Sequence, residues 1–216
     1  MKFKAAIFDF DGTLLNTLAD LAAALNLVLA ANGYKTHPVE AYKYMVGRGM
    51  ENLVRSALAA EKPDMETVLE LQRQIETEYA KCWADTTGTY AGIPELLDGL
   101  TERNISMAIL SNKPHSFMQL IVDKFFGSWH FEVVLGARET CPKKPDPAAV
   151  REIVDIFELR MEDILYIGDS DTDMQTARNA GLLPAGVLWG FRTEKELLDN
   201  GAWQIVAEPS ELLKFF

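Results

Sequence analysis

The first apolar run of the chain is short and ends in carboxylates. Residues 5–10 are apolar apart from Asp9, and Asp11 follows directly. A short apolar run that ends in charged residues is typical of a buried strand whose carboxyl end meets solvent. The pattern therefore predicts a first strand over residues 5–10, with both aspartates at its solvent end.

The segment 16–84 has a different periodicity. Its apolar residues recur three and four positions apart, beginning with Leu18, Leu21, Ala22, Leu25, Val28 and Leu29. Gly33 supplies a stop for this first helix. Helical patterns over 39–46, 50–60 and 64–82 follow, and no strand pattern interrupts them. We therefore expect 16–84 to be helical throughout.

From residue 92 the chain alternates between two kinds of pattern. Apolar runs predict strands over 106–110, 131–135, 164–167 and 184–188, and helical patterns lie over 94–103, 114–126, 147–157 and 172–180. Such alternation predicts a parallel sheet covered by helices on both faces. The expected fold is α/β: a Rossmann-like parallel-sheet core of residues 1–15 and 85–216, with a helical segment, residues 16–84, inserted after the first strand.

Composition and charge narrow the classes of partner. The chain has 216 residues, 48% hydrophobic and 25% charged, as in an ordinary globular protein. Its 32 acidic residues exceed its 21 basic ones, for a net charge of −11. A surface with this much negative charge repels phosphate backbones and anionic lipid. We therefore expect no nucleic-acid partner and no membrane partner. A small anionic substrate responds to a few local cations instead, so it is compatible with this charge. Oligomeric state is open.

The remaining whole-chain features predict a cytoplasmic protein. Cys82 and Cys141 lie far apart and in no metal-binding or redox motif, which favours two reduced thiols. The N-terminus turns acidic before an apolar signal-peptide core can form. The most apolar stretch, 18–31, contains Asp20 and Asn26 and is too short for a membrane span.

Candidate chemistry gathers at the predicted strand ends. Polar segments follow three strands, over 9–13, 111–113 and 168–173, and the segment 143–147 opens a helix. In open parallel sheets, ligands bind beyond the carboxyl ends of the strands. Each segment alone has an ordinary explanation as a turn, a helix cap or an exposed lysine. Their order and joint placement favour a site.

The residues of this edge suit phosphoryl transfer. Asp9 and Asp169 can share Mg²⁺, which prefers carboxylate oxygens. Asp9 could then attack phosphorus, because a metal and Lys144 would offset the repulsion between two anions. Asp11 could protonate the leaving alkoxide and later deprotonate the attacking water. Thr13, Ser111, Asn112 and Lys144 are the candidate phosphate-binding residues.

These segments resemble, in order, the four motifs of the haloacid dehalogenase superfamily of phosphohydrolases. The resemblance implies that Asp9 is the nucleophile and Asp11 the general acid/base. It implies that Mg²⁺ is held by Asp9, the main-chain carbonyl of Asp11 and Asp169, with Asp173 in support. Ser111 and Lys144 match the hydroxyl and lysine of the second and third motifs. The helical segment resembles the family's cap, which closes over the site.

Branches of the superfamily differ at residues that this sequence contains. Dehalogenases lack the second aspartate, here Asp11, and Gly168-Asp169-Ser170 with Asp173 is similar to the phosphatase pattern. Residues 13–15, 46–49 and 111–114 resemble the phosphoglycolate phosphatase-like branch. The resemblance implies a Mg²⁺-dependent phosphomonoester hydrolase acting on a small phosphorylated metabolite, with phosphoglycolate as a candidate.

Some alternatives stay open. Arg48 lies between two glycines on a predicted loop; it is our candidate for the substrate's non-phosphate end, and a solvated loop arginine is the competing interpretation. A phosphomutase or an inorganic pyrophosphatase could use the same scaffold. A receiver-like phospho-aspartate signalling module would use similar residues, but the helical segment and Asp11 argue against it.

Overall fold

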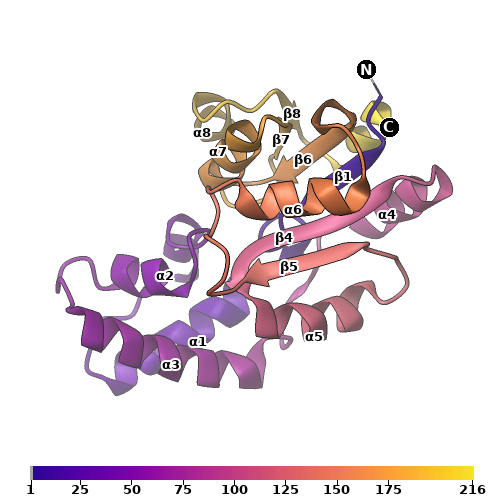
Figure 1. The fold of residues 1–216 in the computed structure, drawn as a ribbon. Helices are drawn as coiled ribbons and strands as arrows, with labels where there is room; N and C mark the ends of the chain where they lie inside the picture. Colours follow the sequence, from indigo (N-terminus) through magenta and orange to yellow (C-terminus); the bar gives the residue numbers. More distant parts are fainter. Residues whose placement is uncertain (1) are drawn as a thin grey trace.

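Six parallel strands form the central sheet of the computed structural model, which describes residues 2–216 (Figure 1). Their order is β5-β4-β1-β6-β7-β8. The strands are β1 (Ala5–Phe8), β4 (Ser106–Pro114), β5 (Val133–Ala137), β6 (Ile164–Gly168), β7 (Leu183–Val187) and β8 (Gln204–Val206). The predicted parallel α/β core is confirmed, with β1 at its centre between β4 and β6.

Helices cover both faces of this sheet. One face carries α4 (Ile93–Glu102), α5 (His115–Phe126) and the 3₁₀ helix η3 (Pro209–Phe215), and the other carries α6 (Ala148–Phe157) and α7 (Asp171–Ala180). Phe8 points into the first layer and Ile7 into the second, as the alternation of side chains along a strand requires. Helix α8 (Glu194–Asp199) lies beside β7 and β8, and the short 3₁₀ helix η2 (Met161–Asp163) precedes β6.

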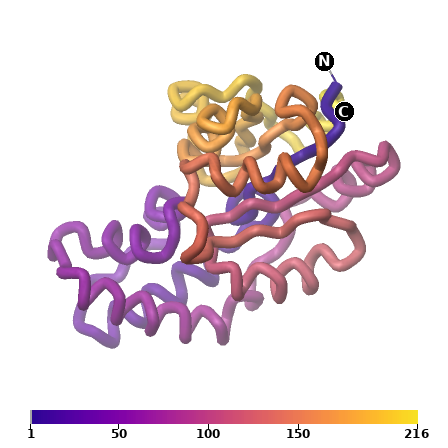
Figure 2. Tube along the Cα trace, viewed as in Figure 1, coloured from indigo at the N-terminus to yellow at the C-terminus, as the bar shows by residue number. Residues whose placement is uncertain are grey.

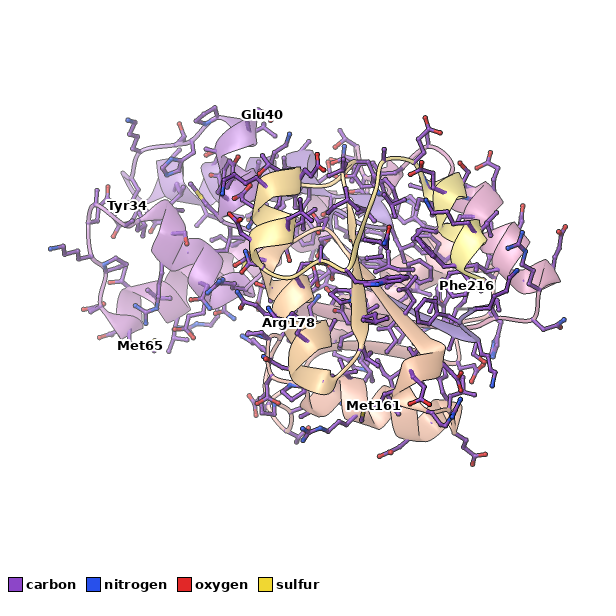
Figure 3. All side chains as sticks on the ribbon, turned by 90° about the horizontal axis from the view of Figure 1, so that it is seen from above. Tyr34, Glu40, Met65, Met161, Arg178 and Phe216 are labelled. Carbon is purple, nitrogen blue, oxygen red and sulfur yellow. The ribbon has the colours of Figure 1, made fainter. Side chains whose placement is uncertain are left out.

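A helical lobe, residues 17–87, lies between two short strands that pair antiparallel, β2 (Leu15–Asn16) and β3 (Gly88–Thr89). Its elements are α1 (Leu18–Ala31), η1 (Val39–Tyr44, 3₁₀), α2 (Met50–Ala57) and α3 (Met65–Cys82). The lobe has a core of its own, formed by the apolar stripe of α1 with residues of α2 and α3. It lies at the end of the molecule toward which β5 points (Figures 1 and 2). Seen from above, Tyr34, Glu40 and Met65 are all on the side of the lobe, and Phe216 is on the opposite side of the molecule (Figure 3).

Asp20 ties the start of the helical lobe to its end. Its buried carboxylate in the first turn of α1 accepts hydrogen bonds from the main-chain N–H groups and hydroxyls of Thr86 and Thr87. Burial alone would raise the pKa of Asp20, but these hydrogen bonds outweigh it and lower the pKa. These hydrogen bonds hold together the two segments by which the chain enters and leaves the lobe.

Strand β4 is longer than predicted. The polar residues 111–113 were expected to follow a strand ending at 110, but they continue β4, whose pairing with β5 shifts register between Leu110 and Pro114. The three side chains are buried, and their polar groups find partners at the carboxyl edge of the sheet. Smaller differences are that β1 ends at Phe8, η1 is a 3₁₀ rather than an α-helix, and β5 begins two residues later than predicted.

Two whole-chain findings complete the fold. Cys82 and Cys141 are both free thiols. None of the helices in residues 2–216 combines the length and apolar character needed to cross a membrane.

Candidate active site

Asp9 lies at the carboxyl end of β1, where its main-chain N–H still donates to Ile167 O at 2.8 Å. The chain then turns sharply through Gly12, whose φ is 90°. A Cβ at Gly12 would lie 2.3 Å from Oδ2 of Asp169, so only glycine allows this close passage. The turn brings the end of β1 directly against Asp169, which follows β6.

Lys144 joins the separate segments at the base of the site. Its Nζ donates to Oδ1 of Asp9 and to Oδ1 of Asp173, each at 2.7 Å. Asn112 holds the main chain of this lysine from both sides: Oδ1 accepts from Lys144 N and Nδ2 donates to Lys144 O. Burial would lower the pKa of Lys144, but Asp173 and Asp9 raise it well above its ordinary value, so the group is an ammonium.

Two more carboxylates come from the end of β6 and the start of α7. Oδ2 of Asp169 accepts from the main-chain N–H of Phe191 at 2.7 Å. Asp173 forms a capping box with Ser170 and accepts a hydrogen bond from the Tyr166 hydroxyl at 3.2 Å. The capping box explains why α7 begins here, and it places Asp173 beneath the strand end.

This cluster fits a divalent cation. One carboxylate oxygen from each of Asp9, Asp169 and Asp173 lies within 4.8 Å of the others, and all three residues are buried. Burial, followed by the charge of Asp173, raises the pKa of Asp169 to about 7 and raises that of Asp9 well above its usual value. Both shifts reflect an excess of buried negative charge that Lys144 alone does not balance. Carboxylate oxygens are the donors that hard divalent cations such as Mg²⁺ prefer.

Asp11 faces the helical lobe and has different partners. Its Oδ1 accepts from the Thr17 hydroxyl at 2.7 Å and from Lys113 Nζ at 3.1 Å, and its Oδ2 lies 3.4 Å from the same Nζ. Lys113 also lies over the ring of Tyr79 from α3, with Nζ 4.6 Å from the ring centre. Burial would lower the pKa of Lys113, but Asp11 raises it, so this lysine is also charged.

A small cavity lies between the strand ends and the helical lobe. The cavity has a volume of about 50 Å³. Core residues form one wall and lobe residues the other: Asp9, Asp11, Ser111, Asn112, Lys113 and Pro114 on the core side, and Leu21, Val46, Gly47, Gly49, Met50 and Leu53 on the lobe side. Asp9 and Asp11 therefore both line the same cavity.

The other predicted site residues lie in varied surroundings. Ser111 lines the cavity, and the buried Oγ1 of Thr13 has no hydrogen-bond partner among the described residues. The amide of Asn112 is occupied by Lys144 and by Gly47 O. Arg48, with 56% of its side chain exposed, pairs with Asp171 at 2.6 Å and is outside the cavity lining. The phosphate-binding and specificity roles of these residues stay predictions.

Our sequence analysis missed one connection between core and lobe. Arg192, in the loop after β7, donates to the main-chain carbonyls of Lys43 and Val46 in the lobe and lies near Asp171. Two residues earlier, a Cβ at Gly190 would lie 2.3 Å from Asp169. This loop thus fixes both Asp169 and the lobe, and no motif in the sequence marked it. Lys113 was also missed as a site residue, although its place at a predicted strand end could have identified it.

Comparison with known proteins places the chain among the hydrolases. The model of the haloacid dehalogenase-like hydrolases matches residues 6–187. A phosphoglycolate phosphatase from Nitrosospira multiformis is 30% identical over 99% of this chain and 96% of its own. One from Pseudomonas fluorescens is 33% identical over 91% of this chain and 74% of its own.

Solved structures agree with these relatives. A Lactobacillus delbrueckii protein assigned as a phosphoglycolate phosphatase superposes with a TM-score of 0.93 at 33% identity, covering 99% of this chain and 98% of that one. The chain belongs to the haloacid dehalogenase-like hydrolase family, and within it to the phosphatases. The predicted resemblance is therefore confirmed, and a receiver-like signalling module is set aside.

Proposed function

We propose that this phosphatase hydrolyses phosphomonoesters through an aspartyl-phosphate on Asp9, with Mg²⁺ as its metal. One observation carries the proposal: Asp9 lines the cavity and is also hydrogen-bonded to Lys144, beside Asp169 and Asp173. A carboxylate attacks a phosphoryl group only where nearby cations offset the repulsion between the two anions. Asp9 has such surroundings and faces the space that a substrate would fill.

The proposed reaction has two steps. A carboxylate oxygen of Asp9 attacks phosphorus, a new O–P bond forms, and the bond from phosphorus to the ester oxygen breaks as Asp11 protonates the leaving alkoxide. Water then attacks the phosphorus of the aspartyl-phosphate while Asp11 takes its proton. Inorganic phosphate leaves, and the carboxylate of Asp9 is restored. Asp11 suits both steps because it lines the same cavity as Asp9.

The buried cluster supplies the charge balance. Asp9, Asp169 and the main-chain carbonyl of Asp11 are the proposed metal ligands, with Asp173 in support. When bound, Mg²⁺ offsets the charge of the phosphoryl group and of the carboxylates. Lys144 provides a second positive charge from the chain itself, held in place by its hydrogen bonds to Asp9 and Asp173.

The remaining predicted residues act around this centre. Ser111 and Thr13 are proposed to donate hydroxyl hydrogen bonds to phosphoryl oxygens. Asn112, whose amide is already occupied, is proposed to act indirectly by fixing the main chain of Lys144. Arg48 would reach a substrate only by leaving its ion pair with Asp171.

The proposed substrate is a small phosphorylated metabolite, and phosphoglycolate is the first candidate. Relatives at 30% and 33% identity are named for that activity. The small cavity also favours a compact ester. Residues 16–84 are proposed to act as the cap over a core of residues 1–15 and 85–216. Phosphomutase and pyrophosphatase activities on this scaffold are the alternatives.

A phosphate-release assay tests the proposal. The panel is phosphoglycolate, sugar phosphates, nucleotides and pyrophosphate, each with Mg²⁺ and with chelator. We expect Mg²⁺-dependent release from a small ester, with Asp9→Asn reducing turnover by about a thousandfold or more because an amide is a poor nucleophile. Asp155→Asn, at an exposed position on α6, is the matched control and should behave as the wild type.

Three outcomes would count against the proposal. Release that persists in a folded Asp9→Asn variant would refute the covalent step. Pyrophosphate as the preferred substrate would replace the ester assignment. No release by the wild type from any ester would refute the phosphomonoesterase itself.

A further inference from the structure

One charged side chain in the cavity has no part in the mechanism above. Among the residues of 2–216 that line the cavity, Lys113 is the sole cation. Lys144 lies below, between Asp9 and Asp173, while Arg48 and Arg192 are outside the lining. Any second anionic group on a substrate would therefore meet Lys113 first.

We infer that Lys113 determines specificity by binding a carboxylate of the substrate, so that the enzyme selects small phosphomonoesters that carry a carboxylate close to the ester oxygen. This inference rests on the proposed function and names the substrate class of the same site. It assigns to a core lysine the role that we predicted for Arg48.

The surroundings of Lys113 support a binding role. Its side chain is only 5% exposed, and its Nζ contacts Asp11 at 3.1 and 3.4 Å. An ammonium has three N–H donors, and the face of the Tyr79 ring takes up charge without accepting a conventional hydrogen bond. Two donors directed at Asp11 thus leave one for a ligand. Burial makes that contact valuable, since water competes little with it.

The opposite wall offers no substitute. The lobe side of the cavity consists of apolar side chains and two glycines. None of these lining side chains carries a charge that could pair with a carboxylate, and an unpaired carboxylate is costly to desolvate. The lobe wall therefore favours the carbon atoms of a substrate and leaves the recognition of charge to Lys113.

The order of residues also restricts the length of the substrate. Phosphorus must lie at Asp9 and the ester oxygen at Asp11, the proposed acid. Lys113 touches Asp11, so a carboxylate bound to Lys113 can be separated from the ester oxygen by only a short carbon link. Phosphoglycolate, with a single carbon between the two groups, meets this requirement.

A pair of substrates isolates the effect. Phosphoglycolate and 2-hydroxyethyl phosphate have the same number of carbons, but only the first carries a carboxylate. We expect the wild type to prefer phosphoglycolate in kcat/KM, and Lys113→Met to reduce that preference by about tenfold to a hundredfold, chiefly through KM. Lys113→Arg keeps the charge and should restore part of it. Because both substrates use Asp11, any disturbance of Asp11 cancels in the ratio.

The outcomes separate the two proposals. Equal losses on both substrates in Lys113→Met, or no preference in an active wild type, would overturn the inference and leave the phosphomonoesterase standing. A wild type inactive on both esters and on the wider panel would overturn the proposed function and this inference with it.

Discussion

Two buried lysines at the carboxyl edge of the sheet have contrasting surroundings. Lys144 lies between two carboxylates at 2.7 Å, with its main chain held on both sides by Asn112. Lys113 contacts one carboxylate at longer distances and otherwise touches an aromatic ring from the lobe. The first lysine lies outside the cavity lining and bridges two carboxylates, and the second lines the cavity.

The difference separates chemistry from recognition. Lys144 and Asp173, which are proposed to serve the reaction of every substrate, are each fixed by several hydrogen bonds. Lys113, which is proposed to distinguish substrates, lines the cavity and is open to a ligand there. Substitution of Lys144 should therefore reduce activity on all substrates to a similar extent. Substitution of Lys113 should reduce activity on some substrates more than on others.

The largest effect outside the nucleophile is expected from Lys144→Met. It leaves the buried carboxylates of Asp9 and Asp173 without their lysine, so we expect a loss of about 3–5 kcal/mol in unfolding free energy without metal, and a fall of about a hundredfold or more in kcat on every ester. Mg²⁺ should stabilise this variant more than the wild type, because the site is more negative. Urea unfolding with Mg²⁺ and with chelator measures both.

Lys143→Met is the matched control for this prediction. Lys143 precedes Lys144 but is exposed, so its loss should change stability by about 0.5 kcal/mol or less. Wild-type stability in Lys144→Met would show that the buried charges do not depend on this lysine.

A smaller effect, equal on all substrates, is expected from Arg192→Gln. The guanidinium joins the core to the lobe through the carbonyls of Lys43 and Val46. Its loss should weaken lobe closure and raise KM about threefold to tenfold for both phosphoglycolate and 2-hydroxyethyl phosphate. Arg151→Gln, at an exposed position on α6, is the control. A change confined to one substrate would mean that Arg192 recognises the ligand itself.

Much of the core could be predicted from local pattern. The apolar runs of β1 and β6 end abruptly in carboxylates, so the strands and the positions of Asp9 and Asp169 follow from residues adjacent in the chain. The apolar stripe of α1 likewise predicts its buried face, because helical periodicity is local. The order of the motifs was enough to identify the family.

Contacts between distant segments could not be predicted in this way. Asn112 binds Gly47 and Lys144, which are separated from it by 65 and 32 positions, and no periodicity encodes such a pairing. The continuation of β4 through polar residues depends on these same partners. Arg192 lies in a loop without a recognisable motif, and its role appears only when the lobe is placed against the core.

The covalent step at Asp9 is the central claim, and trapping the intermediate tests it most directly. The measurement is the intact mass and peptide map of protein quenched in acid during turnover of phosphoglycolate, for the wild type and for Asp11→Asn. The account predicts one phosphoryl group on the peptide containing Asp9, accumulating in Asp11→Asn because hydrolysis of the intermediate is slowed. A phosphoryl group on another residue, or none in either protein while phosphate is being released, would contradict it.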